Sequence, residues 1–566
     1  MRTPLTGRAK WLAWIAVLAA LTLVVFGCLL VGGSSSGQPV RLIGPAIVIA
    51  LALSALGIAG AYFFSWVRLG KNFRRFLFGV ACLITLIALF YAEEDWRGRR
   101  AWRLHKQKWE AKGEKFDIQG FVPPAVPDDQ NFALTPLLKP IYEFTESRKG
   151  MVQTDTNAMA RLEKTDPEVQ GENRQSRLEL GDFEKGEFAD LPACAAFYIG
   201  NTNYPQAAAG SSPGKLILTA LGKFGPEIKE LREAAATRPY SRFPIHYDTQ
   251  PPWSILLPHL SSIKRLSQMM CIHAVAELDA GQSAEALIDL KVALRLSGSI
   301  HDEPFLISHL VRLVTLKMAL QTLREGLARH AWSDAEIVSL QGNLNEVELL
   351  SEYKRAMRGE RALSTEGIAQ MQSHVKEIGF FDNSGGVAAL AAIIPAGWFY
   401  QNMVVISRMH QEFTLSVVNE KDHRVFPQIS RDGAAAFQRL PRTPETILAR
   451  ILMPAFEKAS RQTAIAQARL DCALAACALE RFRIANGKFP ESLSQLTPRF
   501  LKATSHDVMD GEPLHYRREA GGGYVLYSVG WNQTDEGGKV ALKQNRKDST
   551  VDEERGDWVW TMPAQL

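Results

Sequence analysis

The stretch RQTAIAQARLDCALAACALERFRI, residues 461–484, determines how the C-terminal part of the chain folds. Its spacing of apolar residues, three or four apart, is typical of a helix with a wide apolar face. Its many alanines favour the same conformation. Asn486-Gly487 then suits a left-handed C-terminal cap, and Pro490 prevents the helix from continuing. The apolar positions are Ala464, Ala468, Cys472, Leu479 and Phe482.

Short strands are predicted after this helix. Residues 513–517 and 524–529 are rich in β-branched and aromatic side chains, and the glycines at 521–523 between them are a turn signal. Residues 558–560 offer a third short strand. Because a two-stranded hairpin alone is marginally stable, we expect the helix to pack on these strands, with Phe482 facing the sheet.

Three motifs in this region resemble the major pseudopilin of type II secretion systems. They are RFRIANGKFP at 481–490, MDGEPLHY at 509–516 and YVLYSVG at 524–530. The resemblance implies a small α+β head over residues 455–566. In pseudopilins the helix begins at the mature N-terminus, whereas here residues 1–460 precede it and no Gly-Phe-Thr-Leu-x-Glu processing signal does. We therefore do not expect pilus-like fibres.

The same resemblance implies a calcium site in the loop at 532–538. Major pseudopilins bind calcium in the loop that follows the Tyr-Ser-x-Gly strand, and calcium takes six to eight oxygen ligands from carboxylates and carbonyls. Asp535 fits this position best, with Asn532, Glu536 or Asp507 as helpers. An ordinary solvated turn rich in Asn, Asp and Gly is the alternative. No other cofactor is predicted.

The whole chain also resembles an uncharacterised family of large bacterial membrane-anchored proteins that carry this C-terminal segment. The residues that indicate it are WEAKGEK at 109–115, VPPAVPD at 122–128 and GWFYQN at 397–402. This likeness implies no assigned activity.

Three apolar runs without charged residues predict a transmembrane region over residues 1–92, with helices at about 11–31, 42–67 and 76–91. At 1.5 Å per residue, the first run spans about 32 Å, which is enough to cross a bilayer. A cleaved signal sequence is the alternative for that run.

The distribution of basic residues predicts the topology of these spans. The short loop between the first two runs contains only Arg41, whereas the loop at 68–75 contains Arg68, Lys71, Arg74 and Arg75. The positive-inside rule then places the N-terminus and the second loop in the cytoplasm and the C-terminal bulk outside it. The basic residues between 97 and 108 oppose this orientation. We expect 387–406 to form a buried or membrane-surface helix, with a fourth span as the alternative.

The rest of the chain is predicted to be mainly α, with an irregular and helical connecting region at 93–254 and a helical body at 255–454. GQSAEAL at 281–287 resembles half of a tetratricopeptide repeat, but no second copy follows, so we expect one helical hairpin in a bundle. Residues 302–304 are expected to start another helix. Ser333 and Glu336 have the spacing of a capping box, and a long helix to about residue 374 should follow.

Composition and motifs limit the possible functions. A net charge of +5 over 566 residues, without a basic stripe, gives no argument for nucleic-acid binding. The six cysteines are too few for a disulfide framework, and no His-Glu-x-x-His or Cys-x-x-Cys motif occurs. The pattern favours a non-enzymatic scaffold anchored in the cytoplasmic membrane, with the lipid bilayer and envelope proteins as partners. The alternative is an envelope hydrolase whose site is assembled from His246, Asp248 and His259.

Overall fold

The structure is a computed structural model that describes residues 70–147, 150–165, 180–373, 394–453, 456–544 and 549–563. It is mainly helical, with small antiparallel sheets, as the sequence predicted. The chain divides into two compact units, residues 1–94 and 95–566. The predicted spans at 11–31 and 42–67 lie outside the described residues.

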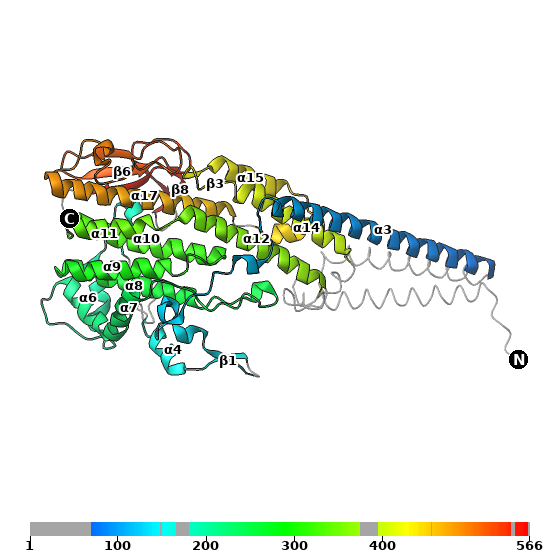
Figure 1. Cartoon of the computed structure of the whole chain (residues 1–566), viewed down its shortest axis with the longest axis horizontal. Helices are drawn as coiled ribbons and strands as arrows, with labels where there is room; N and C mark the ends of the chain where they lie inside the picture. The colour runs from blue at the N-terminus through cyan, green and yellow to red at the C-terminus, as the bar shows by residue number, and fades with distance from the viewer. Residues whose placement is uncertain are drawn as a thin grey trace, which may run out of the picture. The chain divides into compact units, whose positions relative to one another are not determined.

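The helix α3 (Gly70–Glu110), blue in Figure 1, contains the third predicted span. Its segment Asn72–Glu110 is long and apolar enough to cross a membrane by length and composition, and none of its most apolar window is buried. The side chains of Phe78, Leu83 and Leu86 are between 58% and 73% exposed. The same helix continues without interruption into a charged C-terminal part that belongs to the second unit.

Within the second unit, the C-terminal part of α3 packs against α14 (Ala396–Met409). A Cβ atom on Gly98 would lie 2.1 Å from the carbonyl oxygen of Gly397, so the two backbones touch at this crossing. The Asp95 carboxylate accepts a hydrogen bond of 2.8 Å from the Gly397 amide and thereby caps α14. The described half of the apolar run 387–406 is thus a helix with a buried face, and residues 374–393 lie outside the described part.

Helices dominate the second unit. Among the described residues, α10 is the other helix long and apolar enough to span a membrane, but 61% of its apolar window is buried, as in a core helix. The hairpin of α8 and α9 confirms the one predicted at 281–287. The bounds are α4 (Thr156–Glu163), α5 (Leu191–Tyr198), α6 (Pro213–Leu221), α7 (Gly225–Thr237), α8 (His259–Asp279), α9 (Ser283–Gly298), α10 (Leu306–Ala328), α11 (Asp334–Asn345), α12 (Leu349–Ser373), α15 (Pro427–Arg439) and α16 (Ile447–Leu452).

Short 3-10 and π elements and two small hairpins connect these helices. The 3-10 helices are η2 (Ile118–Phe121), η3 (Asp128–Gln130), η4 (Phe132–Leu134), η5 (Lys139–Tyr142), η6 (Phe183–Lys185), η7 (Gly222–Phe224), η8 (Pro252–Ser254) and η11 (Leu493–Leu496), and η10 (His410–Thr414) is a π-helix. The hairpins are β1 (Phe144–Ser147) with β2 (Gly150–Gln153), and β3 (Val418–Asn419) with β4 (Arg424–Val425).

Two predicted helix boundaries are wrong. The capping box at Ser333 is present, but the helix it starts ends at Asn345, and α12 begins separately at Leu349, a fully buried residue. The helix expected from residue 302 begins instead at Leu306. The amide of Leu306 donates to Glu360 of α12 at 2.9 Å, so a distant side chain supplies the cap.

The predicted C-terminal helix is α17 (Phe456–Asn486), and Gly487 follows it with φ 76°, in the left-handed region that the sequence predicted. Figure 1 shows α17 in orange between the helices α10 and α11 on one side and the strand β6 on the other. Its central alanines, cysteines and Leu479 are buried on every side. Small side chains let both layers approach α17 closely.

The predicted sheet is confirmed. The strands β5 (His515–Arg518), β6 (Tyr524–Ser528) and β9 (Trp558–Met562) are antiparallel, in the order β5-β6-β9. A second hairpin, β7 (Val540–Gln544) with β8 (Ser549–Gly556), was not predicted.

Phe482 packs against the core that contains both α17 and the strand residues Tyr524 and Leu526. The Phe482 ring is half-buried and meets Phe500 edge-on, with centroids 5.7 Å apart. In the same core, Tyr524 meets the ring of Phe489, which follows α17, with centroids 4.9 Å apart.

Candidate functional site

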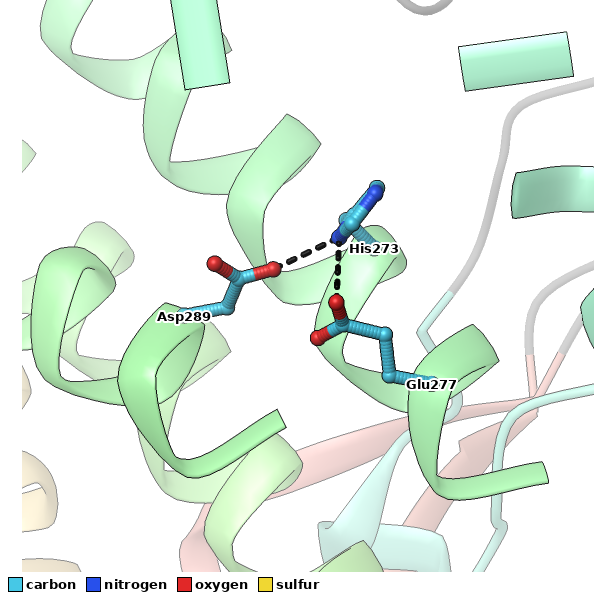
Figure 2. A group of neighbouring side chains, drawn as sticks. All are labelled: His273, Glu277 and Asp289. Carbon is cyan, nitrogen blue, oxygen red and sulfur yellow. Dashed lines mark hydrogen bonds and ion pairs between the residues drawn. The ribbon is translucent and has the colours of Figure 1, made fainter. Parts of the chain in front are cut away.

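Among the described residues, one group of three acidic or histidine side chains has its potential ligand atoms within 4.8 Å of one another. It consists of His273, Glu277 and Asp289 (Figure 2). The first two lie one turn apart on α8, and Asp289 comes from α9. The Nδ1 atom of His273 lies 2.6 Å from Asp289 Oδ2 and 3.3 Å from Glu277 Oε1.

Arg232 of α7 binds the same carboxylates. Its Nε atom donates to Asp289 at 2.5 Å and one terminal nitrogen donates to Glu277 at 2.8 Å, while the other reaches Glu285 at 2.6 Å. Arg232, His273, Glu277 and Asp289 are called the His273 cluster below. It joins three helices through charge-assisted hydrogen bonds.

The charges of this cluster compensate one another. Burial opposes a charged imidazole, but the hydrogen bonds to Asp289 and Glu277 outweigh it and raise the pKa of His273 to about 9. Metal binding needs a deprotonated imidazole nitrogen and free carboxylate lone pairs. Here Arg232 and the His273 ring already bind Asp289 and Glu277 Oε1, and only Glu277 Oε2 lacks a partner among the described residues, so the residues fit an ion-pair network better than a metal site.

The predicted calcium residues are engaged in separate local contacts. Asp535 accepts hydrogen bonds from the Gly537 amide at 2.8 Å and from Tyr527 Oη at 3.1 Å. The amide nitrogen of Asn532 donates to Glu536 at 2.6 Å. Asp507 is fully buried. Its two oxygens accept three hydrogen bonds, from the backbone amides of Met509 and Val529 and from the Ser528 hydroxyl. Asp507 therefore holds two loops together.

Sequence reasoning missed Asp557, which faces the same loop. It is buried and accepts hydrogen bonds from the amides of Glu536, Gly538 and Lys539. Burial, together with the neighbouring Glu536 carboxyl, raises the pKa of Asp557 to about 6. The Oε2 atom of Glu536 is buried and receives no hydrogen bond from a described residue. Residues 532–538 with Asp557 are called the acidic loop below.

The acidic loop has the chemistry that a cation would complete. Two adjacent carboxyls must share a proton or bind a cation when they are removed from water. Carboxylate oxygens and loop carbonyls are the ligands that calcium prefers. No signal in the sequence could have indicated Asp557, because it lies 21 residues after Glu536 and beyond the β7–β8 hairpin.

The structure does not bring the predicted hydrolase residues together. His246 and Asp248 are exposed and alternate with the buried Ile245 and Tyr247. His259 is fully buried, and its two ring nitrogens are occupied by Tyr142 Oη at 2.6 Å and Glu303 Oε1 at 2.7 Å. No ring nitrogen of His259 is left for Asp248.

A different histidine–carboxylate pair reaches solvent. His423, with φ 53°, is the last residue of the β3–β4 turn, and its Nε2 atom lies 3.0 Å from the buried Asp471 of α17. The pair borders an open cleft of about 450 Å³ that Thr504, Ser505 and His506 also line. Non-glycine residues in the left-handed region are uncommon, and such strain is often found at functional sites.

Comparisons with known proteins add no identification. No protein-family model, curated protein or solved structure matches this chain. The resemblance to the major pseudopilin therefore rests on the three motifs between 481 and 530, and it stays a hypothesis.

Proposed function

We propose that this chain is a membrane-anchored scaffold of the bacterial envelope, with its C-terminal bulk outside the cytoplasmic membrane and a pseudopilin-like head. In this proposal its partners are the lipid bilayer and other envelope proteins. The process it serves is envelope or secretion related. No catalytic step is assigned to it.

The continuity of α3 is the observation that carries this proposal. One helix of 41 residues contains an apolar, exposed half and a charged half that packs in the second unit. At 1.5 Å per residue it is roughly 60 Å long, about twice the hydrocarbon thickness of a bilayer. In this proposal, the apolar half of the helix is the membrane anchor, and its charged half belongs to the body.

The organisation of the body supports a scaffold rather than an enzyme. Its most conspicuous polar group, the His273 cluster, joins three helices through ion pairs within the chain. The helix α17 is buried between the body helices and the sheet. Both features hold elements in a fixed arrangement, which is what presentation of a binding surface requires.

Fusions to alkaline phosphatase, which is active only outside the cytoplasm, test the topology. We expect activity after Lys108 and after Leu566. A fusion that is active at Lys108 and silent at Leu566 would point to a fourth span near Val387. Two silent fusions would overturn the proposed orientation. Pull-down from intact membranes, with and without the first 92 residues, then identifies envelope partners that require the anchor.

The alternative function, an envelope hydrolase, has one observation in its favour, the His423–Asp471 pair at an open cleft. A histidine held by a buried carboxylate is the usual arrangement of a general base. The test is a panel of chromogenic esters, phosphoesters and peptides. Turnover that His423→Gln abolishes, while His301→Gln preserves it, would favour the enzyme, and no turnover on any of these substrates would count against it.

A further inference from the structure

A groove of about 690 Å³ opens between α7, α9, α10 and α11. Its volume lies in the range of ligand-binding pockets. Part of its wall is apolar, and Ile288 there has 41% of its surface exposed. The other apolar wall residues are Ala235, Ala236, Pro239, Val292, Leu294, Leu316 and Val347.

Two of the cations that line the groove are neutralised within the chain. Arg232 belongs to the His273 cluster and binds three carboxylates. Arg312 forms two hydrogen bonds with the buried Glu352, at 2.8 and 3.0 Å, and a third with Ser297. A ligand gains little from these two guanidinium groups, because their donors are already used.

Two other cations in the groove have no carboxylate within 4.0 Å among the described residues. Lys291 donates to the Ser339 hydroxyl at 2.8 Å. Arg295 donates to two backbone carbonyls, those of Arg238 and Tyr240, and its buried Nε atom has no acceptor. Both residues lie on α9, four positions apart and therefore on one face.

The groove therefore carries more uncompensated positive charge than negative charge. Burial lowers the pKa of Arg295, and the charge of Glu346 offsets this only in part. The carboxylate that lines the groove, Glu346, is exposed at the C-terminal end of α11. His301 at the rim is bonded to the Gly298 carbonyl and lies 3.1 Å from Asp302.

We propose that this groove is the docking site for an acidic, partly apolar peptide segment of a partner protein. Cβ atoms four residues apart on a helix are roughly 6 Å apart. Acidic side chains two positions apart in an extended peptide are about 7 Å apart and point the same way. Such a peptide can pair one carboxylate with Lys291 and the next with Arg295, and its alternate residues meet the apolar wall.

This inference rests on the proposed scaffold function and specifies the partner's chemistry. Charge complementarity selects an acidic peptide over a basic one, and the apolar wall selects a peptide over a simple anion. Like the body of the scaffold, the groove is built from packed helices. It needs no rearrangement of the His273 cluster, which holds α7, α8 and α9 together on one side of it.

The test uses the full chain in detergent and a short fluorescein-labelled peptide in which glutamate and leucine alternate. Fluorescence anisotropy measures its affinity, and the matched probe replaces each glutamate by glutamine. We expect Lys291→Gln and Arg295→Gln each to weaken binding of the acidic peptide about tenfold. The matched control is Lys229→Gln on α7, a side chain that is 78% exposed and lies outside the groove. It should leave the affinity unchanged.

A charge-reversal variant keeps the test decisive if Arg295→Gln does not fold. Lys291→Glu should abolish binding of the glutamate–leucine peptide and create binding of a lysine–leucine peptide. Equal affinity for the glutamate and glutamine probes, or full affinity in both Lys291 variants, would overturn the inference. Displacement of the peptide by inorganic phosphate, at an ionic strength matched with chloride, would also overturn it in favour of a small-anion site.

These measurements separate the two proposals. Peptide affinity in detergent does not depend on membrane orientation or on the partners captured from intact membranes. If the fusions and the pull-down succeed while the groove variants keep full affinity, the scaffold stands and the docking site falls. If the fusions fail while the affinity is lost as expected, the groove stands and the proposed topology falls.

Discussion

The His273 cluster and the acidic loop are both rich in carboxylates, but different charges compensate them. In the His273 cluster, Arg232 and a protonated imidazole meet the carboxylates directly. In the acidic loop, backbone amides bind Asp557, and its ionisable neighbour is another carboxyl, that of Glu536. Most of the charge of the first group is compensated within the chain, with Glu277 Oε2 as its one buried oxygen that lacks a partner among the described residues, whereas the second group needs a proton or a cation. Proximity of acidic groups is therefore weak evidence for a metal until the donors around them have been counted.

The largest expected effect comes from breaking the His273 cluster. Asp289→Ala leaves Arg232 and His273 without their shared buried partner, and such losses cost about 3–5 kcal/mol of unfolding free energy. Glu285→Ala is the matched control, because Glu285 binds the same arginine but has a side chain that is 49% exposed. Its loss should cost less than about 1 kcal/mol. Urea unfolding of both variants measures the two losses of unfolding free energy. Equal losses would show that the cluster does not stabilise the packing of the three helices.

The second effect is the pH dependence of the same cluster. The folded pKa of His273 is about 9, above the unfolded value of 6.5, so its contribution is fully present below pH 6.5. It is lost as the pH rises from 6.5 to 9 and amounts to about 3 kcal/mol at most. Stability measured from pH 6 to pH 10, relative to His273→Gln, should show this decline. If the difference between the two proteins stayed constant with pH, the imidazole would not be charged in the folded state.

The third effect tests whether the acidic loop binds calcium. Calcium at about one hundred times its dissociation constant should stabilise the chain by about 2.7 kcal/mol if the loop binds it. Asp535→Ala and Asp557→Asn should each remove this gain, whereas Asp507→Asn should lower the stability without abolishing the calcium response. Thermal unfolding with calcium or with chelator measures the shift. A parent protein that does not respond leaves the loop as an ordinary turn.

The sequence predicted what neighbouring residues determine. The helix at 461–484, its cap at Gly487, the capping box at Ser333 and the third strand near residue 558 all depend on local patterns, and all are present. The length of the helix after Ser333 was missed because neither Gly nor Pro marks the break between Asn345 and Leu349.

The candidate sites were less predictable than the fold, because their contacts join distant segments. Arg232 meets Asp289 across 57 residues, and Asp557 meets Glu536 across 21. The hydrolase triplet failed for a local reason. Its histidines lie in an aromatic stretch. Buried and exposed residues alternate around His246, which is exposed, whereas His259 begins α8 and is buried in the core. Motif spacing can identify residues that are able to react, but packing decides which of them meet.

The last expected effect is the sharpest comparison, since it sets proton and calcium in competition at one carboxyl. Burial and Glu536 raise the folded pKa of Asp557 from 3.8 to about 6, so between these two pH values the folded loop holds a proton that the unfolded chain has released. The contribution of Asp557 is therefore fully present below pH 3.8 and is lost as the pH rises through 6. This window lies below that of His273.

Other groups titrate in the same window with the opposite sign. Burial lowers the pKa values of His309 and His410 to about 4 and about 3, so their contributions are lost as the pH falls below 6.5. The measurement must therefore be the difference in melting temperature between the parent chain and Asp557→Asn. Without calcium this difference should change between pH 4 and pH 6, with the parent losing stability relative to the variant. Saturating calcium should reverse that trend, because the ion replaces the shared proton and binds more tightly as the carboxyl ionises. If calcium leaves this difference in melting temperature unchanged at every pH, the acidic loop is neutralised by a proton alone and does not bind calcium.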